Sequence, residues 1–444
     1  MSPAQVSQRL LPKDPRGRAT FRSVRCSDSQ MRRGLPLLIA LLAVFAAVFP
    51  AAGFSAPSDD RALDKALTKQ MRAAGPFSGA YVLNATDRAT LFKWKSDTPR
   101  VLASNTKLFT AAGVLDSLGP EGKLSTLVLG SGALEEDGTW RGDLYLRGSG
   151  DPTFGSADFV RRNYGTGATA EELADEIEAR GITRVTGRVY GDESRFDSLR
   201  GGPDSGYGTS IWVGPLSGLS WNRGLANDRG TAFQSNPPAF AAARFDALLE
   251  ARGVSVRGKP AAGQAPTGAP ELATVESPPA SDLLRDMLKP SDNFFAEMLV
   301  KTLAPAPATT RSGTRAAALH ASALGARVQM VDGSGLSPGN KASPRSVGRL
   351  IDSLMTSPEW TAFDRALPVA GKDGTLHDRM ESGPARGRCR AKTGTIRGVS
   401  TLSGYCKARS GDRLVFSFLM NGVSTTGARR LQDRMAQALA RYNG

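Results

Sequence analysis

Residues 104–120 read SNTKLFTAAGVLDSLGP and set the plan of this 444-residue chain. Apolar residues recur in this stretch at every third or fourth position, which predicts a helix from Ser104 to Leu118. Gly119-Pro120 then ends the helix, because these residues are typical of helix C-termini. Ser104 and Lys107 are three residues apart at its start, so the spacing places their side chains on one face, one turn apart.

Ser104 and Lys107 are a candidate nucleophile and its base. A serine hydroxyl attacks poorly until a neighbouring group takes its proton. The chain has two histidines, His320 and His377, and neither lies in a triad-like setting. A lysine can serve instead if burial or a nearby cation lowers its pKa, and Lys392 is the expected cation. The alternative for Lys107, a surface lysine, agrees poorly with the apolar residues that follow it.

A second motif, Ser291-Asp292-Asn293, lies between two predicted helices. We expect Ser291 to relay a proton to the leaving amine, and Asn293 to orient either the substrate amide or the base lysine. The alternative is structural, with Ser291 or Asp292 as the N-cap of a helix over residues 294–303. The two roles are compatible.

A third motif, Lys392-Thr393-Gly394, is predicted to lie on a strand. There we expect Lys392 to attract a substrate carboxylate, Thr393 to hydrogen-bond it, and Gly394 to let substrate approach the backbone closely. The backbone N–H groups of Ser104 and Thr395 are the expected donors to an oxyanion. No metal and no cofactor is expected.

The third motif belongs to a predicted hairpin. Strands over residues 387–396 and 399–407, joined at Arg397-Gly398, would place Cys389 directly opposite Cys406. In an oxidising compartment such a pair can form a disulfide. The alternative is two unpaired, small apolar residues, and both interpretations stay open.

Residues 1–55 are predicted to be a leader and signal peptide. The basic stretch Met31-Arg32-Arg33 precedes an apolar run over residues 35–49, and small residues follow Pro50. The run is short for a bilayer span, so an uncleaved anchor is the weaker alternative. We therefore expect export, to an extracellular, periplasmic or cell-wall-associated location.

The chain carries a formal net charge of +15, and without residues 1–55 it would carry +9. Such a surplus favours peripheral association with an anionic envelope, although a solvated arginine-rich surface is the plainer alternative. Aromatic residues do not alternate with a basic stripe, so we expect no nucleic-acid partner.

The three motifs in this order are typical of penicillin-binding proteins and class A β-lactamases. Together with four further sequence segments, these motifs make the chain resemble the D-Ala-D-Ala carboxypeptidase/endopeptidase family of low-molecular-mass penicillin-binding proteins (class C, peptidase family S13). The resemblance covers essentially the whole chain after the leader. The additional phrases are Gly150-Asp151-Pro152-Thr153, Gly191-Asp192-Glu193-Ser194, Asp332-Gly333-Ser334-Gly335-Leu336-Ser337 and Ala391 to Tyr405.

The resemblance implies an α+β fold, in which a penicillin-binding/β-lactamase-like transpeptidase core, a sheet flanked by helices, is split by an inserted β-rich α+β domain. The expected core segments are 56–121 and 277–444, and the expected insertion is 122–276. The 187 positions between the first two motifs agree with a large insertion. It is shorter than in fuller family members, so one of their two extra domains is expected to be reduced or absent.

The resemblance also implies a serine-type D-Ala-D-Ala carboxypeptidase, with endopeptidase activity on cross-links left open. Ser104 would attack the penultimate D-Ala carbonyl of peptidoglycan stem peptides, and water would hydrolyse the acyl-enzyme. Penicillin and other β-lactam inhibitors would acylate Ser104 and remain there.

Two alternatives are weighed against this expectation. A class A β-lactamase is disfavoured because the chain shows no Glu-x-x-Leu-Asn segment and has too long a gap between motifs. A non-catalytic envelope protein that binds peptidoglycan or β-lactams would be expected to carry a broken motif, whereas all three are intact.

Overall fold

The computed structural model describes residues 58–227 and 230–444. The predicted leader and signal peptide, residues 1–55, lie outside the described residues. Within the described ranges, no helix combines the length and the apolar character that crossing a bilayer requires.

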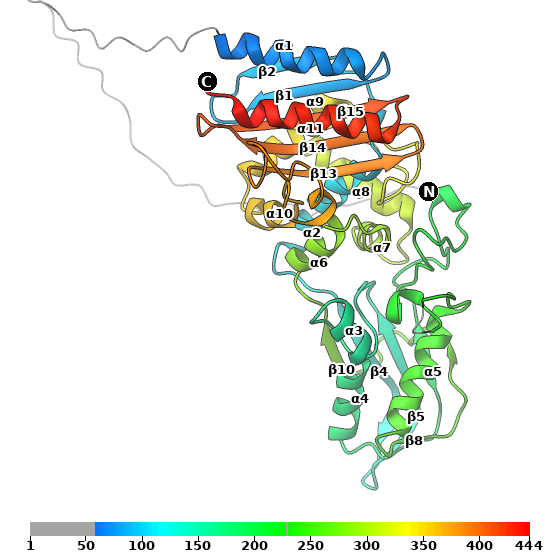
Figure 1. The fold of residues 1–444 in the computed structure, drawn as a ribbon. Coiled ribbons are helices and arrows are strands. Elements are labelled where there is room, and N and C mark those ends of the chain that lie inside the picture. The colour runs from blue at the N-terminus through cyan, green and yellow to red at the C-terminus, as the bar shows by residue number, and fades with distance from the viewer. Residues whose placement is uncertain (1–57, 228–229) are drawn as a thin grey trace, which may run out of the picture. The chain divides into compact units, whose positions relative to one another are not determined.

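A five-stranded antiparallel sheet combines strands from the first and last parts of the described residues (Figure 1). Two neighbouring strands of this sheet are far apart in sequence, and Gly79 of one lies opposite Leu419 of the other. The predicted hairpin and its register are confirmed. In spatial order the strands are β13 (Cys389–Ile396), β14 (Val399–Lys407), β15 (Arg413–Asn421), β1 (Gly79–Asn84) and β2 (Thr90–Trp94).

Each face of this sheet is covered by helices. Alternate residues of a strand point to opposite faces, so Phe416 packs toward α1 (Ser58–Ala73) and α11 (Thr425–Arg441), which lie on the face seen in Figure 1. Val415 points the other way, toward α9 (Pro344–Met355). The sheet is therefore buried on both sides.

The second layer is built around α2 (Thr106–Leu118), which is buried along most of its length. It packs against α6 (Ala280–Leu288), α7 (Asn293–Thr302) and α8 (Thr310–Ala323). The predicted helix is confirmed with one difference, because Ser104 lies just before α2 in a 3-10 turn. The remaining small elements are that turn, η1 (Ala103–Asn105), α10 (Trp360–Ala366), η4 (Gly374–Leu376), and the small sheet of β3 (Arg100–Val101), β11 (Val328–Gln329) and β12 (Lys341–Ala342).

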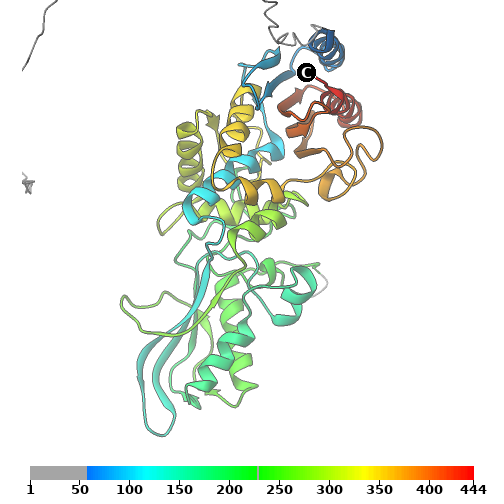
Figure 2. The same cartoon turned by 90° about the vertical axis from the view of Figure 1, so that its left-hand side faces the viewer.

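A second sheet is formed within the segment predicted as an insertion. In Figure 2 its strands lie on one side and two helices, α4 (Ala170–Ala179) and α5 (Pro237–Glu250), on the other. Phe245 and Leu249 of α5 pack onto the sheet in a separate apolar core. The strands are β4 (Ser125–Leu134), β5 (Thr139–Gly148), β6 (Arg184–Val185), β7 (Val189–Asp192), β8 (Ser255–Val256), β9 (Ala261–Ala262) and β10 (Glu271–Glu276), and α3 (Ala157–Asn163) and two short 3-10 turns, η2 (Pro203–Ser205) and η3 (Asn222–Gly224), complete the segment.

The chain leaves and re-enters the core at one place. Glu276, the last residue of β10, lies opposite Ser125, the first residue of β4. Beyond this pair, the Ala280 N–H donates to the Gly122 carbonyl at 2.8 Å. Adjacent ends are what an inserted domain needs, and the limits 56–121, 122–276 and 277–444 stay predictions.

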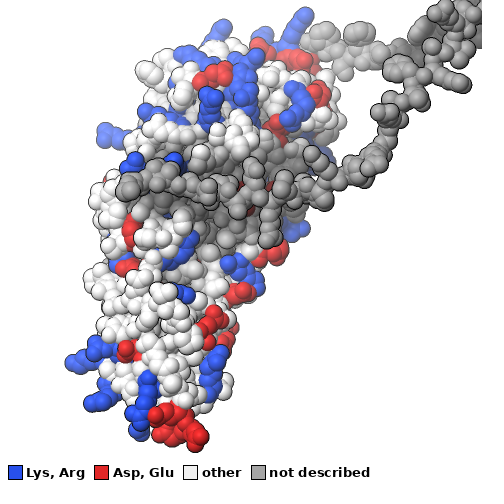
Figure 3. All heavy atoms as spheres, turned by 180° about the vertical axis from the view of Figure 1, so that it is seen from behind, with Lys and Arg blue, Asp and Glu red and all other residues white. Residues whose placement is uncertain are grey.

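Charges of both signs are distributed over the surface. On the face in Figure 3, Lys and Arg side chains lie among Asp and Glu side chains. Some charged side chains of the described residues form ion pairs, for example Lys123 with Glu276 at 2.8 Å. The positive surplus is therefore spread rather than gathered into one stripe on that face.

Candidate active site

Ser104 lies in a sharp turn that two glycines make room for. Ala103 before it has a φ of +47°, a left-handed conformation that is uncommon for a residue with a side chain. A Cβ at Gly335 would lie 1.9 Å from the Ala103 carbonyl oxygen, and a Cβ at Gly394 would lie 2.9 Å from the Ser104 amide nitrogen. Gly394 thus allows the protein's own strand to approach the turn, and its expected role toward substrate stays a prediction.

Lys107 reaches Ser104 from the first turn of α2. Its Nζ lies 3.2 Å from Ser104 Oγ, 2.7 Å from Asn293 Oδ1 and 2.7 Å from the Ser334 carbonyl oxygen. A neutral amine has two N–H donors and one lone pair. If Asn293 and Ser334 accept those two donors, the lone pair faces the Ser104 hydroxyl. This geometry suits a base.

The pKa of Lys107 is lowered to about 8, chiefly by complete burial, against the opposing effect of nearby Glu297, Asp292 and Asp332. Lys392 is also fully buried, and its pKa lies well below the ordinary value because of burial and the charge of Lys107. The charge of Lys392 is thus not what lowers the pKa of Lys107. Burial acts first on both lysines, and the repulsion is felt most by Lys392.

A loop over Asp332–Ser337 holds the Ser334 carbonyl against Lys107. Glu297, on α7, accepts from the backbone N–H groups of Gly333 and Ser334 at 3.2 and 2.8 Å. Asp332 accepts from two further loop amides at 2.7 Å each. Burial and the neighbouring Asp332 raise the pKa of Glu297 to about 7. The sequence of this loop was among the segments that carry the family resemblance, but its contact with Lys107 was not predicted.

Ser291 and Lys392 form the second pair of the site. Lys392 Nζ donates to Ser291 Oγ at 2.7 Å and to the Thr393 carbonyl at 2.8 Å. Ser291 has a φ of +66°, so the loop holds it in an uncommon conformation. Thr393 Oγ1 in turn bonds to Thr375 Oγ1 at 2.7 Å. The second and third motifs are thus joined directly.

The second motif is also held by residues of the inserted segment. Asp292 is the N-cap of α7, accepting from the Phe295 N–H at 2.9 Å, which confirms the structural alternative for this residue. Its other oxygen pairs with Arg223 at 2.9 Å. Asn293 Nδ2 donates to the Trp212 carbonyl at 3.2 Å. The sequence analysis did not identify Arg223 or Trp212, because no local sequence pattern indicates such long-range contacts.

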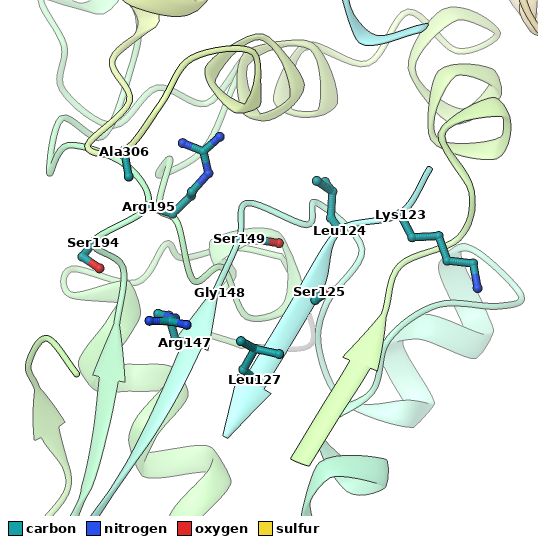
Figure 4. Close-up of a pocket in the computed structure, with 10 residues that line it drawn as sticks. All are labelled: Lys123, Leu124, Ser125, Leu127, Arg147, Gly148, Ser149, Ser194, Arg195 and Ala306. Carbon is teal, nitrogen blue, oxygen red and sulfur yellow. The ribbon is translucent and has the colours of Figure 1, made fainter. Parts of the chain in front are cut away.

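All three motifs open into one hollow of about 420 Å³. A second hollow of about 430 Å³, where β4 and β5 meet the loops at Arg195 and Ala306, contains no motif residue (Figure 4). The residues that line the first hollow are Ser104, Ser291, Gly374, Thr375, Asp378, Arg379, Thr393, Thr395 and Arg429.

The hairpin that carries the third motif is cross-linked. Cys389 and Cys406 lie directly opposite each other, as the register predicted. They form a disulfide with an S–S distance of 2.08 Å. In the described residues, no cluster of three or more His, Cys, Asp or Glu side chains is arranged to hold a metal ion.

The fold and the site together define a serine hydrolase with a penicillin-binding/β-lactamase-like core and an inserted domain. The chain matches the model of the D-Ala-D-Ala carboxypeptidase 3 (S13) family over residues 60–229 and 225–442. It belongs to this family, and is thus a serine-type D-Ala-D-Ala carboxypeptidase.

Individual relatives agree with this assignment. The chain is 30% identical to a D-alanyl-D-alanine carboxypeptidase of Actinomadura sp. R39, over 83% of this chain and 82% of that protein. It is also 30% identical to a carboxypeptidase of Mycobacterium tuberculosis, over 89% and 87% of the two chains. Among solved structures, penicillin binding protein 4 of Haemophilus influenzae matches with a TM-score of 0.71 at 22% identity, covering 83% of this chain and 97% of that one. This last likeness supports the fold.

Proposed function

We propose that the chain removes the terminal D-Ala from peptidoglycan stem peptides through an acyl-enzyme on Ser104. The observation that carries this proposal is the setting of Lys107 Nζ. Two acceptors lie 2.7 Å from it, and the third direction is filled by Ser104 Oγ at 3.2 Å. In the neutral amine, the lone pair then has one place to point, which is the hydroxyl that must lose a proton.

The two buried lysines suit a proton relay in which the pair carries one excess proton. Lys107 holds this proton most of the time, because nearby carboxylates favour its charged form and its charge lowers the pKa of Lys392. The relay begins in the minor arrangement, with Lys107 neutral and Lys392 charged. In acylation, Lys107 takes the proton of Ser104, whose Oγ attacks the penultimate D-Ala carbonyl, while the N–H groups of Ser104 and Thr395 stabilise the oxyanion. The new charge on Lys107 repels the charge on Lys392. Lys392 therefore releases a proton through Ser291, 2.7 Å away, to the amine of the departing D-Ala.

Deacylation reverses this relay. Water attacks the ester carbonyl and gives its proton, through Ser291, to the now neutral Lys392. Lys107 returns its proton to Ser104 Oγ as the ester bond breaks. Both lysines regain their starting protonation, so one turnover consumes one water and no external base.

We infer that β-lactams acylate the same serine. The three motifs support this inference, and one structure of Haemophilus influenzae penicillin binding protein 4, with a TM-score of 0.66, is described as complexed with a β-lactam. Export to the cell envelope, by a signal within residues 1–55, is part of the proposal because peptidoglycan lies outside the membrane. The spread positive surplus supports peripheral association there.

The test compares the wild-type chain with Ser104→Ala, and with Ser255→Ala as a control at an exposed serine on β8. Each is incubated with a fluorescent penicillin and with a peptide that ends in D-Ala-D-Ala. We expect covalent labelling and D-Ala release from the wild type and the control, and neither from Ser104→Ala. Rapid drug turnover without peptide cleavage would point to a β-lactamase, and labelling without any hydrolysis to a binding protein. If Ser104→Ala is still labelled covalently, Ser104 is not the nucleophile.

A further inference from the structure

The substrate of the proposed reaction ends in a carboxylate, and the cation expected to meet it, Lys392, already donates two of its three N–H groups to the protein. The side chain of Lys392 is fully buried. Its Nζ donates to Ser291 Oγ and to the Thr393 carbonyl, both of them protein acceptors. In the relay proposed above, Lys392 also changes charge during each turnover. A carboxylate that must stay bound throughout acylation needs a permanent cation on the open side of the hollow.

Arg429 on α11 is in that place. It lines the same hollow as Ser104, Thr393 and Thr395. Its Nη2 lies 3.4 Å from Thr395 Oγ1, and its side chain is exposed to solvent. A guanidinium keeps its charge at every pH at which the enzyme works, and its planar fork suits a carboxylate.

The other charged side chains of the hollow are already paired. Arg379 donates to Asp433 at 2.6 Å and to Gln432, and it is largely buried. Asp378 is exposed and contacts His377, which is charged only when protonated. Across residues 58–227 and 230–444, no carboxylate lies within salt-bridge distance of Arg429. Arg429 is thus the guanidinium of the hollow that is left for a ligand.

We propose that Arg429, together with the hydroxyls of Thr393 and Thr395, binds the free α-carboxylate of the leaving D-amino acid. This inference rests on the proposed function and deepens it. It makes the chain selective for leaving groups that carry a carboxylate next to the scissile nitrogen. Leaving groups whose carboxyl is amidated are cleaved poorly, because the guanidinium then lacks its anionic partner.

The experiment measures kcat/KM for a peptide ending in D-Ala-D-Ala and for the same peptide ending in D-Ala-D-Ala amide. The variants are Arg429→Met, Arg429→Lys and, as a matched control, Arg430→Met. Arg430 is the next residue of α11, is also exposed, and does not line the hollow. Folding of each variant is checked by thermal unfolding and by the extent of labelling with fluorescent penicillin at saturation.

We expect Arg429→Met to lower the acid-to-amide ratio of kcat/KM by about 10- to 100-fold, the range for a lost charge-assisted hydrogen bond. Arg429→Lys should restore part of the ratio, and Arg430→Met should keep the wild-type ratio. Equal losses for both peptides, an unchanged ratio, or the same change in Arg430→Met would each overturn the assignment of Arg429. A wild-type chain that labels but cleaves neither peptide would overturn the proposed function itself, and this inference with it.

Discussion

The region around Ser104 buries several charged side chains that face one another, whereas the inserted domain has a core that is mainly apolar. Near the nucleophile, Lys107, Lys392, Glu297 and Asp332 are all fully buried. Buried charges are costly unless each finds partners, and here the partners are other groups of the site. In the inserted domain the core around Phe245 is apolar, and the buried carboxylates Asp151 and Asp192 accept hydrogen bonds from nearby backbone N–H groups. The comparison suggests that chemistry is concentrated in one region, and stability in the other.

The largest effect is expected for Lys107→Met. The substitution keeps the volume of the buried side chain and removes the base, so the rate of acylation by penicillin should fall by about 10³-fold. Removal of a desolvated charge partly offsets the hydrogen bonds that are lost, so stability should change less than the rate. Stopped-flow labelling gives the rate, and urea unfolding gives the stability.

If Lys107→Met instead unfolds the chain while Ser104→Ala leaves it folded, the lysine is chiefly a structural residue. The exposed Lys65→Met in α1 controls for the loss of a lysine as such. It should change neither measurement.

The opposite result is expected for Phe245→Ala in the inserted domain. Phe245 is fully buried between α5 and the second sheet. Truncation of such a residue should lower the free energy of unfolding by about 3–5 kcal/mol. The labelling rate of the protein that remains folded should stay within about twofold of wild type, because an apolar cavity there changes no group of the site. A large fall in the labelling rate would show that the core of the inserted domain also affects catalysis at Ser104.

The sequence predicted the framework well wherever the signal was local. The hairpin register that opposes Cys389 and Cys406 follows from strand periodicity and one turn. By contrast, α8 was missed because its buried face consists of small residues such as Gly313 and Ala317, which carry little hydrophobic periodicity. Gly113 of α2 packs against Ala317 at this close helix contact.

Only the part of the candidate site that depends on local sequence spacing could be predicted. Ser104 and Lys107 share a helical turn, so spacing alone relates them. Glu297 and Arg223 act through contacts with distant segments, and no spacing rule marks them. The role expected of Lys392 toward a carboxylate stays a prediction, and the sequence could not show that its Nζ would be buried against Ser291 and the Thr393 carbonyl.

The pH dependence of acylation tests the buried charges directly. Lys107 acts as a base only when neutral, and its pKa is about 8. In the proposed relay the lysine pair must hold one proton, which it keeps below pH ~8 and loses above it. The labelling rate should therefore be nearly flat from pH ~6 to ~8 and fall about tenfold per pH unit above pH ~8. The groups that face Lys107 are Glu297, Asp292, Asp332 and Lys392.

The free energy of unfolding should also depend on pH through Lys107. The folded-state pKa of Lys107 lies below its ordinary value of 10.5, so the unfolded chain binds more protons between pH 8 and 10.5. Stability should rise with pH across this window, and part of the rise should be absent in Lys107→Met. A labelling rate that rises about tenfold per pH unit between pH ~6 and ~8 would show that the pair must first lose a proton, and would contradict the relay.

The smallest effect is expected for Arg223→Met, which asks whether the inserted domain serves the site at all. Arg223 pairs with Asp292 at 2.9 Å and lies over the ring of Phe294 at 5.0 Å. Loss of this pair should loosen the loop of Ser291 and lower the acylation rate by about 3- to 10-fold. Arg244→Met is the matched control, since Arg244 lies over the ring of Phe240 within the inserted domain, away from the motifs.

A double-mutant cycle with Asp292→Asn separates the pair from its surroundings. If the two residues act on the site through each other, the double variant should acylate about as fast as the slower single variant. Additive losses would mean that Arg223 acts independently of the second motif. If the acylation rate of Arg223→Met equals that of the wild type, the inserted domain contributes to stability and not to the site. The expected fall in the rate would instead mean that the inserted domain holds the loop that carries Ser291 in place.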